Sequence, residues 1–141
     1  VASAQMAAEL TQMKLMCGGI TSEMLEQLVC SMLNDGTYHK HRKRVVQGLQ
    51  ASGARVTGWL QGLGFRLSAP YAGGMFIWAT LPAGLDGETL AQQALARGLV
   101  LAPGILFGFD PQLRRCMRFN VAHTDTPAVM AGVEALLTNP T

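Results

Sequence analysis

The chain has 141 residues, of which 49% are hydrophobic and 14% charged, a composition typical of a folded domain and not of a disordered segment. Its formal net charge of +2 is too small to predict a nucleic-acid partner by itself. The three cysteines lack Cys-x-x-Cys spacing, so we expect free thiols in a reducing cytoplasm, with a metal site as the less favoured alternative.

The first part of the chain predicts two helices. Apolar residues recur at helical spacing over residues 3–16, and Gly18-Gly19 ends that pattern. Thr21-Ser22 offers N-cap side chains to a second helix that stops at Asn34-Asp35-Gly36. The N-terminus lacks a signal-peptide pattern, and no apolar run approaches the roughly twenty residues that span a bilayer. We therefore expect a cytoplasmic fragment that is entered within a helix and has no membrane partner.

Residues 37–61 lack proline and keep a helical period, which predicts one long, bent helix. Gly48, Gly53 and Gly58 each cost about 1 kcal/mol relative to alanine there, which indicates close packing, a bend or a tolerated weakness. The basic run at residues 39–44 is a candidate for binding phosphates. It spreads over nearly two turns without an aromatic platform, so a solvated helix face is the favoured interpretation.

The second half changes to short strands. We expect strands at residues 65–68, 75–81, 99–102 and 115–122, helices at 86–97 and 126–137, and a loop at 103–112. The order is therefore three helices followed by β-β-α-β-β-α. The histidines lack metal-ligand spacing, and neither a nucleophile elbow nor a carboxylate pair is present, so we expect no independent hydrolytic chemistry.

The last predicted strand presents an arginine. Residues 115–122 alternate, so that an apolar set faces one way while Arg118 and Asn120 face the other. A guanidinium on a strand with a packed back is a rigid fork for a carboxylate, but spacing alone favours an ordinary arginine on a solvent-facing sheet. Gly73 and Gly74 either bring the backbone close to a ligand or, as is commoner, form a turn.

Four segments carry a family resemblance through their order and spacing. They are Tyr71–Pro82, Asp86, Arg97–Gly104 and Cys116–Ala122. Together they resemble the C-terminal domain of class I/II aminotransferases, which are fold-type I enzymes dependent on pyridoxal phosphate. The earlier stretches Thr21–Gln27 and Leu33–His41 are similar to the segment just before that domain, so the resemblance covers nearly the whole chain.

The resemblance implies a substrate site. In this family an arginine of the penultimate strand holds the α-carboxylate of the amino-acid substrate, and Arg118 matches it. The substrate-binding residues expected here are Arg118, Asn120, Gly73, Gly74 and Met75. Phe107 is a weaker candidate for the rim of the same site. Thr21 and Ser22 are candidates for approaching the site of a neighbouring subunit.

The family chemistry also needs a lysine that forms a Schiff base with pyridoxal phosphate, an aspartate on the pyridine nitrogen and a phosphate cradle. In the family all of these lie in the large domain, upstream of the segments matched here. The lysines of this chain, Lys14, Lys40 and Lys43, lie on predicted helices without the Ser-rich setting of the family lysine. We therefore expect pyridoxal phosphate in the full-length parent, but no covalently bound cofactor and no catalytic residue in this chain.

The fold that the resemblance implies is α+β: a small, largely antiparallel sheet with helices on one face, fed by a long interdomain helix. Residues 1–35 would be a helical tail of the large domain, residues 36–63 the interdomain helix and residues 64–141 the small C-terminal domain. Because the apolar faces of the tail would lack their parental cover, we expect the chain to form a homodimer, either by simple dimerisation or by domain swapping.

The stretch Asp35–Arg44 further resembles the MocR subgroup of GntR-type bacterial regulators. Those proteins join an N-terminal winged-helix DNA-binding domain to an aminotransferase-like domain that senses an effector with pyridoxal phosphate. The sequence therefore predicts the effector-binding half of a cytoplasmic regulator, which binds an amino-acid-like molecule and contacts DNA only through a missing domain. Part of a genuine aminoadipate- or aromatic-type aminotransferase, and a free-standing small-molecule-binding domain, are the alternatives.

Overall fold

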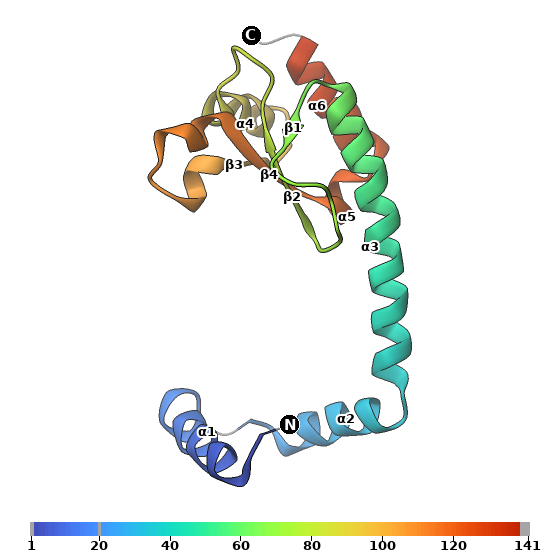
Figure 1. Ribbon diagram of the computed structural model, residues 1–141, viewed down its shortest axis with the longest axis vertical. Helices are drawn as coiled ribbons and strands as arrows, with labels where there is room; N and C mark the ends of the chain where they lie inside the picture. The colour runs from blue at the N-terminus through green and yellow to red at the C-terminus, as the bar shows by residue number, and fades with distance from the viewer. Residues whose placement is uncertain (1, 20, 139–141) are drawn as a thin grey trace. The chain divides into compact units, whose positions relative to one another are not determined.

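The computed structural model describes residues 2–19 and 21–138 (Figure 1). The chain divides into two compact units, Val1–Lys43 and Arg44–Thr141. The long helix α3, Thr37–Gly62, begins in the first unit and continues through the second as one unbroken element, as predicted. The assignment of residues 1–35, 36–63 and 64–141 to parts of a longer protein stays a prediction.

The first unit holds the two predicted helices, α1 (Ala4–Cys17) and α2 (Glu23–Asn34). The Ser3 hydroxyl caps α1 by accepting a hydrogen bond from the Met6 amide at 3.3 Å. Ser22 stands at the N-cap of α2 but makes no side-chain hydrogen bond there. None of the described residues of either helix is buried, so their apolar side chains remain at the surface of this unit.

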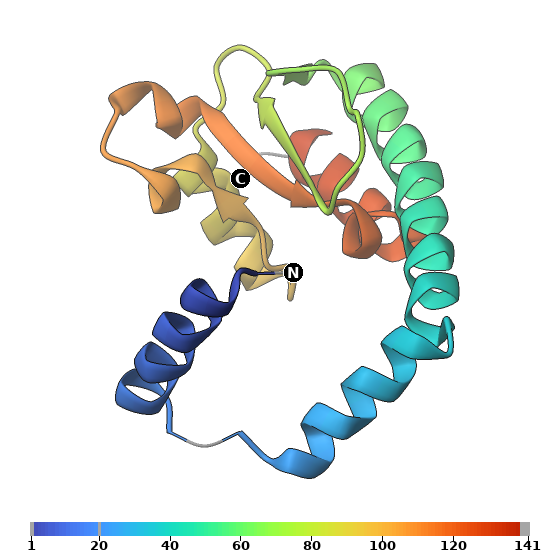
Figure 2. The same cartoon turned by 60° about the horizontal axis from the view of Figure 1, so that its bottom comes forward.

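The second unit contains a four-stranded sheet in which every neighbouring pair is antiparallel (Figure 2). Its strands are β1 (Arg66–Leu67), β2 (Phe76–Thr80), β3 (Ala102–Pro103) and β4 (Cys116–Asn120), in the order β1-β2-β4-β3. The register places Arg118 of β4 opposite Trp78 of β2 on one side and Ala102 of β3 on the other. Arg118 therefore lies in the middle of the sheet.

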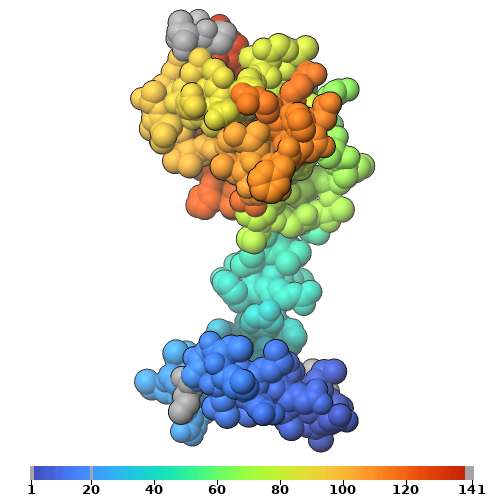
Figure 3. Space-filling view, turned by 90° about the vertical axis from the view of Figure 1, so that its left-hand side faces the viewer, coloured from blue at the N-terminus to red at the C-terminus, as the bar shows by residue number. Residues whose placement is uncertain are grey.

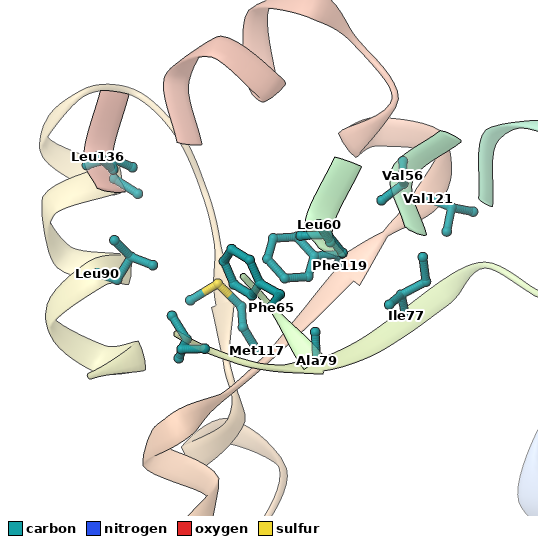
Figure 4. Close-up of a cluster of buried hydrophobic side chains, with 12 residues drawn as sticks. Val56, Leu60, Phe65, Ile77, Ala79, Leu90, Met117, Phe119, Val121 and Leu136 are labelled. Atoms are coloured by element: carbon teal, nitrogen blue, oxygen red, sulfur yellow. The ribbon is translucent and has the colours of Figure 1, made fainter. Parts of the chain in front are cut away.

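One face of this sheet packs on helices and forms the core (Figure 4). The alternation of β4 turns Met117 and Phe119 inward, and both are almost completely buried. Phe119 meets the Phe65 ring edge to face, with ring centroids 5.5 Å apart. The remaining core comes from α3, β2 and the residue after it, α4 (Gly87–Ala96), α5 (Val121–Thr124) and α6 (Pro127–Thr138): Val56, Leu60, Ile77, Ala79, Leu81, Leu90, Ala94, Val121 and Leu136. The predicted α+β fold, with helices on one face of a small antiparallel sheet, is confirmed.

Polar contacts hold the helices in place. Asp86 caps α4 as predicted, and its carboxylate accepts hydrogen bonds from the Glu88 and Thr89 amides at 3.1 and 3.0 Å. The Arg55 guanidinium of α3 forms a two-pronged ion pair with Asp125, the residue that follows α5. These contacts fix the helical layer behind the sheet.

The structure differs from the predicted elements in three places. The strand predicted at 115–122 ends at Asn120, because the Asn120 Oδ1 accepts hydrogen bonds from the Ala122 and His123 amides and so begins α5. The strand predicted at 99–102 is reduced to β3. The loop predicted at 103–112 is largely helical, with the 3-10 helices η1 (Gly104–Phe107) and η2 (Pro111–Arg115).

Candidate functional site

The face of the sheet opposite the core carries Arg118 and a group of aromatic rings. The Arg118 side chain is half-buried, and its guanidinium carbon lies 4.3 Å from the centre of the Phe76 ring and 4.1 Å from the centre of the Phe107 ring. The Trp78 ring meets Phe107 edge to face, with centroids 5.6 Å apart and an interplanar angle of 76°. A cation over aromatic faces is held by the ring quadrupoles, typically by about 0.5–2 kcal/mol.

Arg118 has no acidic partner among the described residues. The arginine ion pairs recorded in that part of the chain belong to Arg55 and Arg114, which meet Asp125 and the pair Asp86 and Glu88. Every other arginine is exposed, whereas Arg118 is partly withdrawn from water. A partly buried guanidinium without a neighbouring carboxylate attracts an anion from solution more strongly than a fully exposed one does.

A cavity of about 510 Å³ adjoins Arg118. Its polar lining includes Asn120 and His123 beside Arg118, and its apolar lining includes Leu99 and Val129. Concave sites with an apolar lining and a few polar groups are typical small-molecule sites. The arrangement suits a molecule that has a carboxylate and a modest apolar body.

Asn120 reaches this cavity but also has a structural role. Its Oδ1 accepts from the Ala122 and His123 amides at 3.1 and 3.3 Å, so this oxygen is occupied in capping α5. The side-chain amide nitrogen is the group that can donate to a bound anion. The structure therefore brings Arg118 and Asn120 to one cavity, with Asn120 also fixing the end of the strand.

The glycine pair forms a turn beside a different cavity. Gly73 and Gly74 have φ of 119° and 101°, values that favour glycine, and the Tyr71 hydroxyl lies 2.8 Å from the Gly74 carbonyl oxygen. Gly73 lines a cavity of about 310 Å³ that shares Phe76 with the one beside Arg118. Met75 is exposed, and its carbonyl accepts a hydrogen bond from the Val121 amide at 2.9 Å. Gly73, Gly74 and Met75 are not among the residues lining the Arg118 cavity.

The remaining candidates are distributed as follows. Phe107, predicted as a rim residue, lies directly over the Arg118 guanidinium. Thr21 lines an apolar cavity of about 390 Å³ along α2 in the first unit, with Leu25 and Val29. Phe76 and Trp78 are not among the residues that the sequence predicts for the site, although the alternation of their strand places them on the face opposite Ile77 and so on the side of Arg118.

Two carboxylates of this unit, those of Asp86 and Asp125, take part in structural hydrogen bonds and ion pairs. The pKa of Asp86 is lowered, chiefly by the hydrogen bond that the Thr89 backbone amide donates and then by the one that the Arg114 guanidinium donates. The pKa of Asp125 is lowered chiefly by the hydrogen bonds from Arg55. No group of three His, Cys, Asp or Glu side chains within residues 2–19 and 21–138 is arranged to hold a metal ion. In the same ranges, no helix is both long and apolar enough to cross a membrane.

The positions of the lysine side chains do not fit covalently bound pyridoxal phosphate. Lys14 lies on α1 and pairs with Glu26, while Lys40 and Lys43 lie exposed on the first turns of α3. All three belong to the first unit, and the sequence from Arg44 onward contains no lysine. The unit that carries Arg118 therefore supplies no amine for a Schiff base.

Figure 3 shows the segment from η1 to β4, drawn in orange, at the surface of that unit.

No protein-family model matches the chain. An aromatic-amino-acid aminotransferase of Thermococcus litoralis is 34% identical over 64 residues, which cover 45% of this chain and 15% of that protein. An HTH-type transcriptional regulator of Escherichia coli, YjiR, is 26% identical over 117 residues, which cover 81% of this chain and 25% of the regulator. The chain thus spans a quarter or less of the length of these relatives.

Among solved structures, the α-aminoadipate aminotransferase LysN of Thermus thermophilus superposes with a TM-score of 0.69 at 24% identity. The superposition covers 98% of this chain and 38% of that enzyme. The similarity therefore extends over both units but over little more than a third of the enzyme. The relatives and structural neighbours of this chain include aminotransferases and an HTH-type regulator, and the chain has the fold of the corresponding part of an aminotransferase.

Proposed function

We propose that this chain is the C-terminal part of the effector-sensing, aminotransferase-like domain of a GntR-type regulator of the MocR subgroup. Its role is to hold the carboxylate of an amino-acid-like effector through Arg118. The observation that carries the proposal is a half-buried guanidinium flanked by two aromatic rings, beside a cavity of about 510 Å³ and without an acidic partner in the described chain.

The residues of the site take distinct parts in this proposal. Arg118 donates two charge-assisted hydrogen bonds to the carboxylate, and the Asn120 amide nitrogen donates a further one. The turn formed by Gly73 and Gly74, with Met75, does not line the Arg118 cavity, and we propose that it contacts the effector from the neighbouring cavity, which shares Phe76. Pyridoxal phosphate, when bound in the parent protein, supplies the electrophile and electron sink for amino-acid chemistry. Because the lysines here do not fit that role, the cofactor would be held by residues outside this chain, and Thr21 and Ser22 would approach a neighbouring subunit.

Two observations bear on the choice of parent. The alignment with the regulator spans 81% of this chain, whereas that with the aromatic-amino-acid aminotransferase spans 45%, which favours the regulator. The second candidate is a genuine aminotransferase of the aminoadipate or aromatic type, favoured by the higher identity of 34% within the shorter alignment. In both cases we propose a cytoplasmic homodimer, and in the regulator DNA is bound only by a separate N-terminal domain.

The experiment uses the full-length protein that contains this chain, supplied with pyridoxal phosphate. Calorimetry would measure binding of each of the twenty standard L-amino acids, and parallel assays would measure amino transfer to 2-oxoglutarate and retention of the protein's own promoter DNA. Amino-acid binding that changes DNA retention without turnover supports the regulator. Turnover without DNA retention supports the aminotransferase. Failure to bind or turn over any amino acid would contradict both.

A further inference from the structure

We infer that Phe107 is a positioning residue for Arg118: together with Phe76 it holds the guanidinium in place before a carboxylate arrives. The inference deepens the proposed function and rests on it for its biological meaning. The physical part, that the Phe107 ring restrains Arg118, can be tested without any ligand.

The two rings reach Arg118 from separate parts of the chain. Phe76 is the first residue of β2, and Phe107 is the last residue of η1. Their ring centres lie 4.3 and 4.1 Å from the guanidinium carbon, so both are in contact with the cation. Each Phe nevertheless remains more than 40% exposed, at 43% and 42%. Large aromatic side chains at the surface that serve no core are better explained by the cation they contact.

The position of Phe107 is fixed by close packing around η1. Gly104, the first residue of η1, is buried, and a Cβ there would clash with the Leu113 carbonyl oxygen and lie 2.9 Å from the Cys116 Cβ. Only glycine lets η1 approach η2 and β4 this closely. At the other end of η1, the Trp78 ring meets the Phe107 ring edge to face. The Phe107 ring is thus held in place by the close packing at Gly104, where η1 begins, and by the Trp78 ring, where η1 ends.

The benefit of this support is entropic. An arginine side chain loses rotamer freedom when a ligand immobilises it, and that loss weakens binding. Two rings that already restrict the guanidinium remove part of this cost before the ligand binds. No carboxylate of the described chain competes for the guanidinium. Removing one ring should therefore weaken carboxylate binding by about three- to tenfold, the usual effect of one immobilised side chain.

A ring that only braces η1, or that only touches a ligand's side chain, would behave differently. Bracing predicts that Phe107 substitutions change stability without changing the environment of the guanidinium. Ligand contact predicts that affinity falls equally for a carboxylate and for its uncharged amide. If Phe107 positions Arg118, Phe107 substitutions should change the environment of the guanidinium. They should also lower the affinity for the carboxylate but not for its uncharged amide.

The ligand-free test is the NMR signal of the Arg118 Nε–H group in the 141-residue chain, assigned by its loss in Arg118→Lys. In the wild type, ring currents should displace this proton upfield from the signals of exposed arginines. Phe107→Leu should move it back toward them, Phe107→Tyr should keep the displacement, and Leu106→Ala, an exposed neighbour on η1, should leave it unchanged. An Nε–H signal unchanged in Phe107→Leu overturns the inference.

The ligand test follows the same signal during titration with sodium propionate, with propionamide as the uncharged control. Phe107→Leu should weaken propionate binding about three- to tenfold, Phe107→Tyr should restore it to within about twofold, and Leu106→Ala should match the wild type. Equal propionate affinity in Phe107→Leu and the wild type would overturn the inference. If propionate does not perturb the wild-type signal at all, the carboxylate role of Arg118 fails, while the ligand-free test still decides the role of Phe107.

Discussion

The Tyr71 ring lies directly against the backbone of Gly53, so that a Cβ at position 53 would overlap ring atoms Cε1 and Cζ. The Tyr71 hydroxyl is in hydrogen-bonding distance of two carbonyl oxygens, that of Leu49 on α3 at 2.9 Å and that of Gly74 at 2.8 Å. One tyrosine thus joins the long helix to the glycine turn that precedes β2. Of the three explanations for the helix glycines, close packing holds at Gly53.

Gly53→Ala should therefore destabilise the chain, although alanine favours helices. We expect a net loss of roughly 1–2 kcal/mol in the free energy of unfolding, because the tethered ring cannot move aside without losing its hydrogen bonds. Gly58→Ala is the matched control, since nothing lies within 4 Å of a Cβ at that position of the same helix. It should gain up to about 1 kcal/mol. Urea unfolding measures both, and equal effects at the two positions would contradict the packing argument.

The Arg55–Asp125 ion pair predicts a specific dependence of stability on pH. Hydrogen bonds from Arg55 lower the pKa of Asp125 in the folded chain, so the pair stabilises the fold fully above the ordinary Asp pKa of about 3.9. That contribution is lost as the pH falls through the lowered folded pKa. The difference in unfolding free energy between the wild type and Asp125→Asn should shrink as the pH is lowered from 6 to 3. A difference that grows on acidification would contradict the sign of the pKa shift.

The uncovered apolar side chains of the first unit predict self-association. Leu25 and Val29 of α2 are both 55% exposed and line the same apolar cavity. Helical faces of this kind are normally buried against a partner surface. Light scattering should find a dimer for the wild type and a shift toward monomer for the double variant Leu25→Ser and Val29→Ser, while Gln27→Ser on the same helix should stay dimeric. A monodisperse wild-type monomer would count against the predicted homodimer.

The positions of the lysines predict the outcome of a labelling experiment. Lys14, Lys40 and Lys43 are exposed on helices and lie outside the unit that holds Arg118. Incubation of the chain with pyridoxal phosphate, followed by borohydride reduction and mass spectrometry, should give only scattered, substoichiometric adducts. A single stoichiometric lysine adduct would show that the chain carries a cofactor site of its own.

The sequence predicts most of the fold because its local signals agree with the tertiary structure. The period-two alternation around Met117 and Phe119 identified the buried face of β4, and Asp86 marked the start of α4. The strand end was misplaced because Asn120 continues the alternation while its side chain already caps α5. Asn120 fits the pattern of a strand residue and that of a helix cap equally well. The hydrogen bonds that its side-chain oxygen accepts from the Ala122 and His123 amides make it the cap.

The site was only partly predictable for a different reason. Arg118 could be identified because its own strand presents it, and the outward Phe76 could have been identified from the alternation of β2. The contact between Phe107 and Arg118 depends on η1 folding back over the sheet, which Gly104 permits through packing against distant residues. No periodicity within residues 103–112 encodes that approach.

We expect Arg118 to anchor a carboxylate, and the most direct measurement of this role is calorimetry on the full-length protein with the amino acid that it binds most tightly. Arg118→Ala should weaken that affinity by roughly 1.5–3 kcal/mol, the usual loss for a hydrogen bond to a charged group. Arg115→Ala, an exposed arginine three residues earlier, should bind as the wild type does. Unchanged affinity in a correctly folded Arg118→Ala protein would contradict the account.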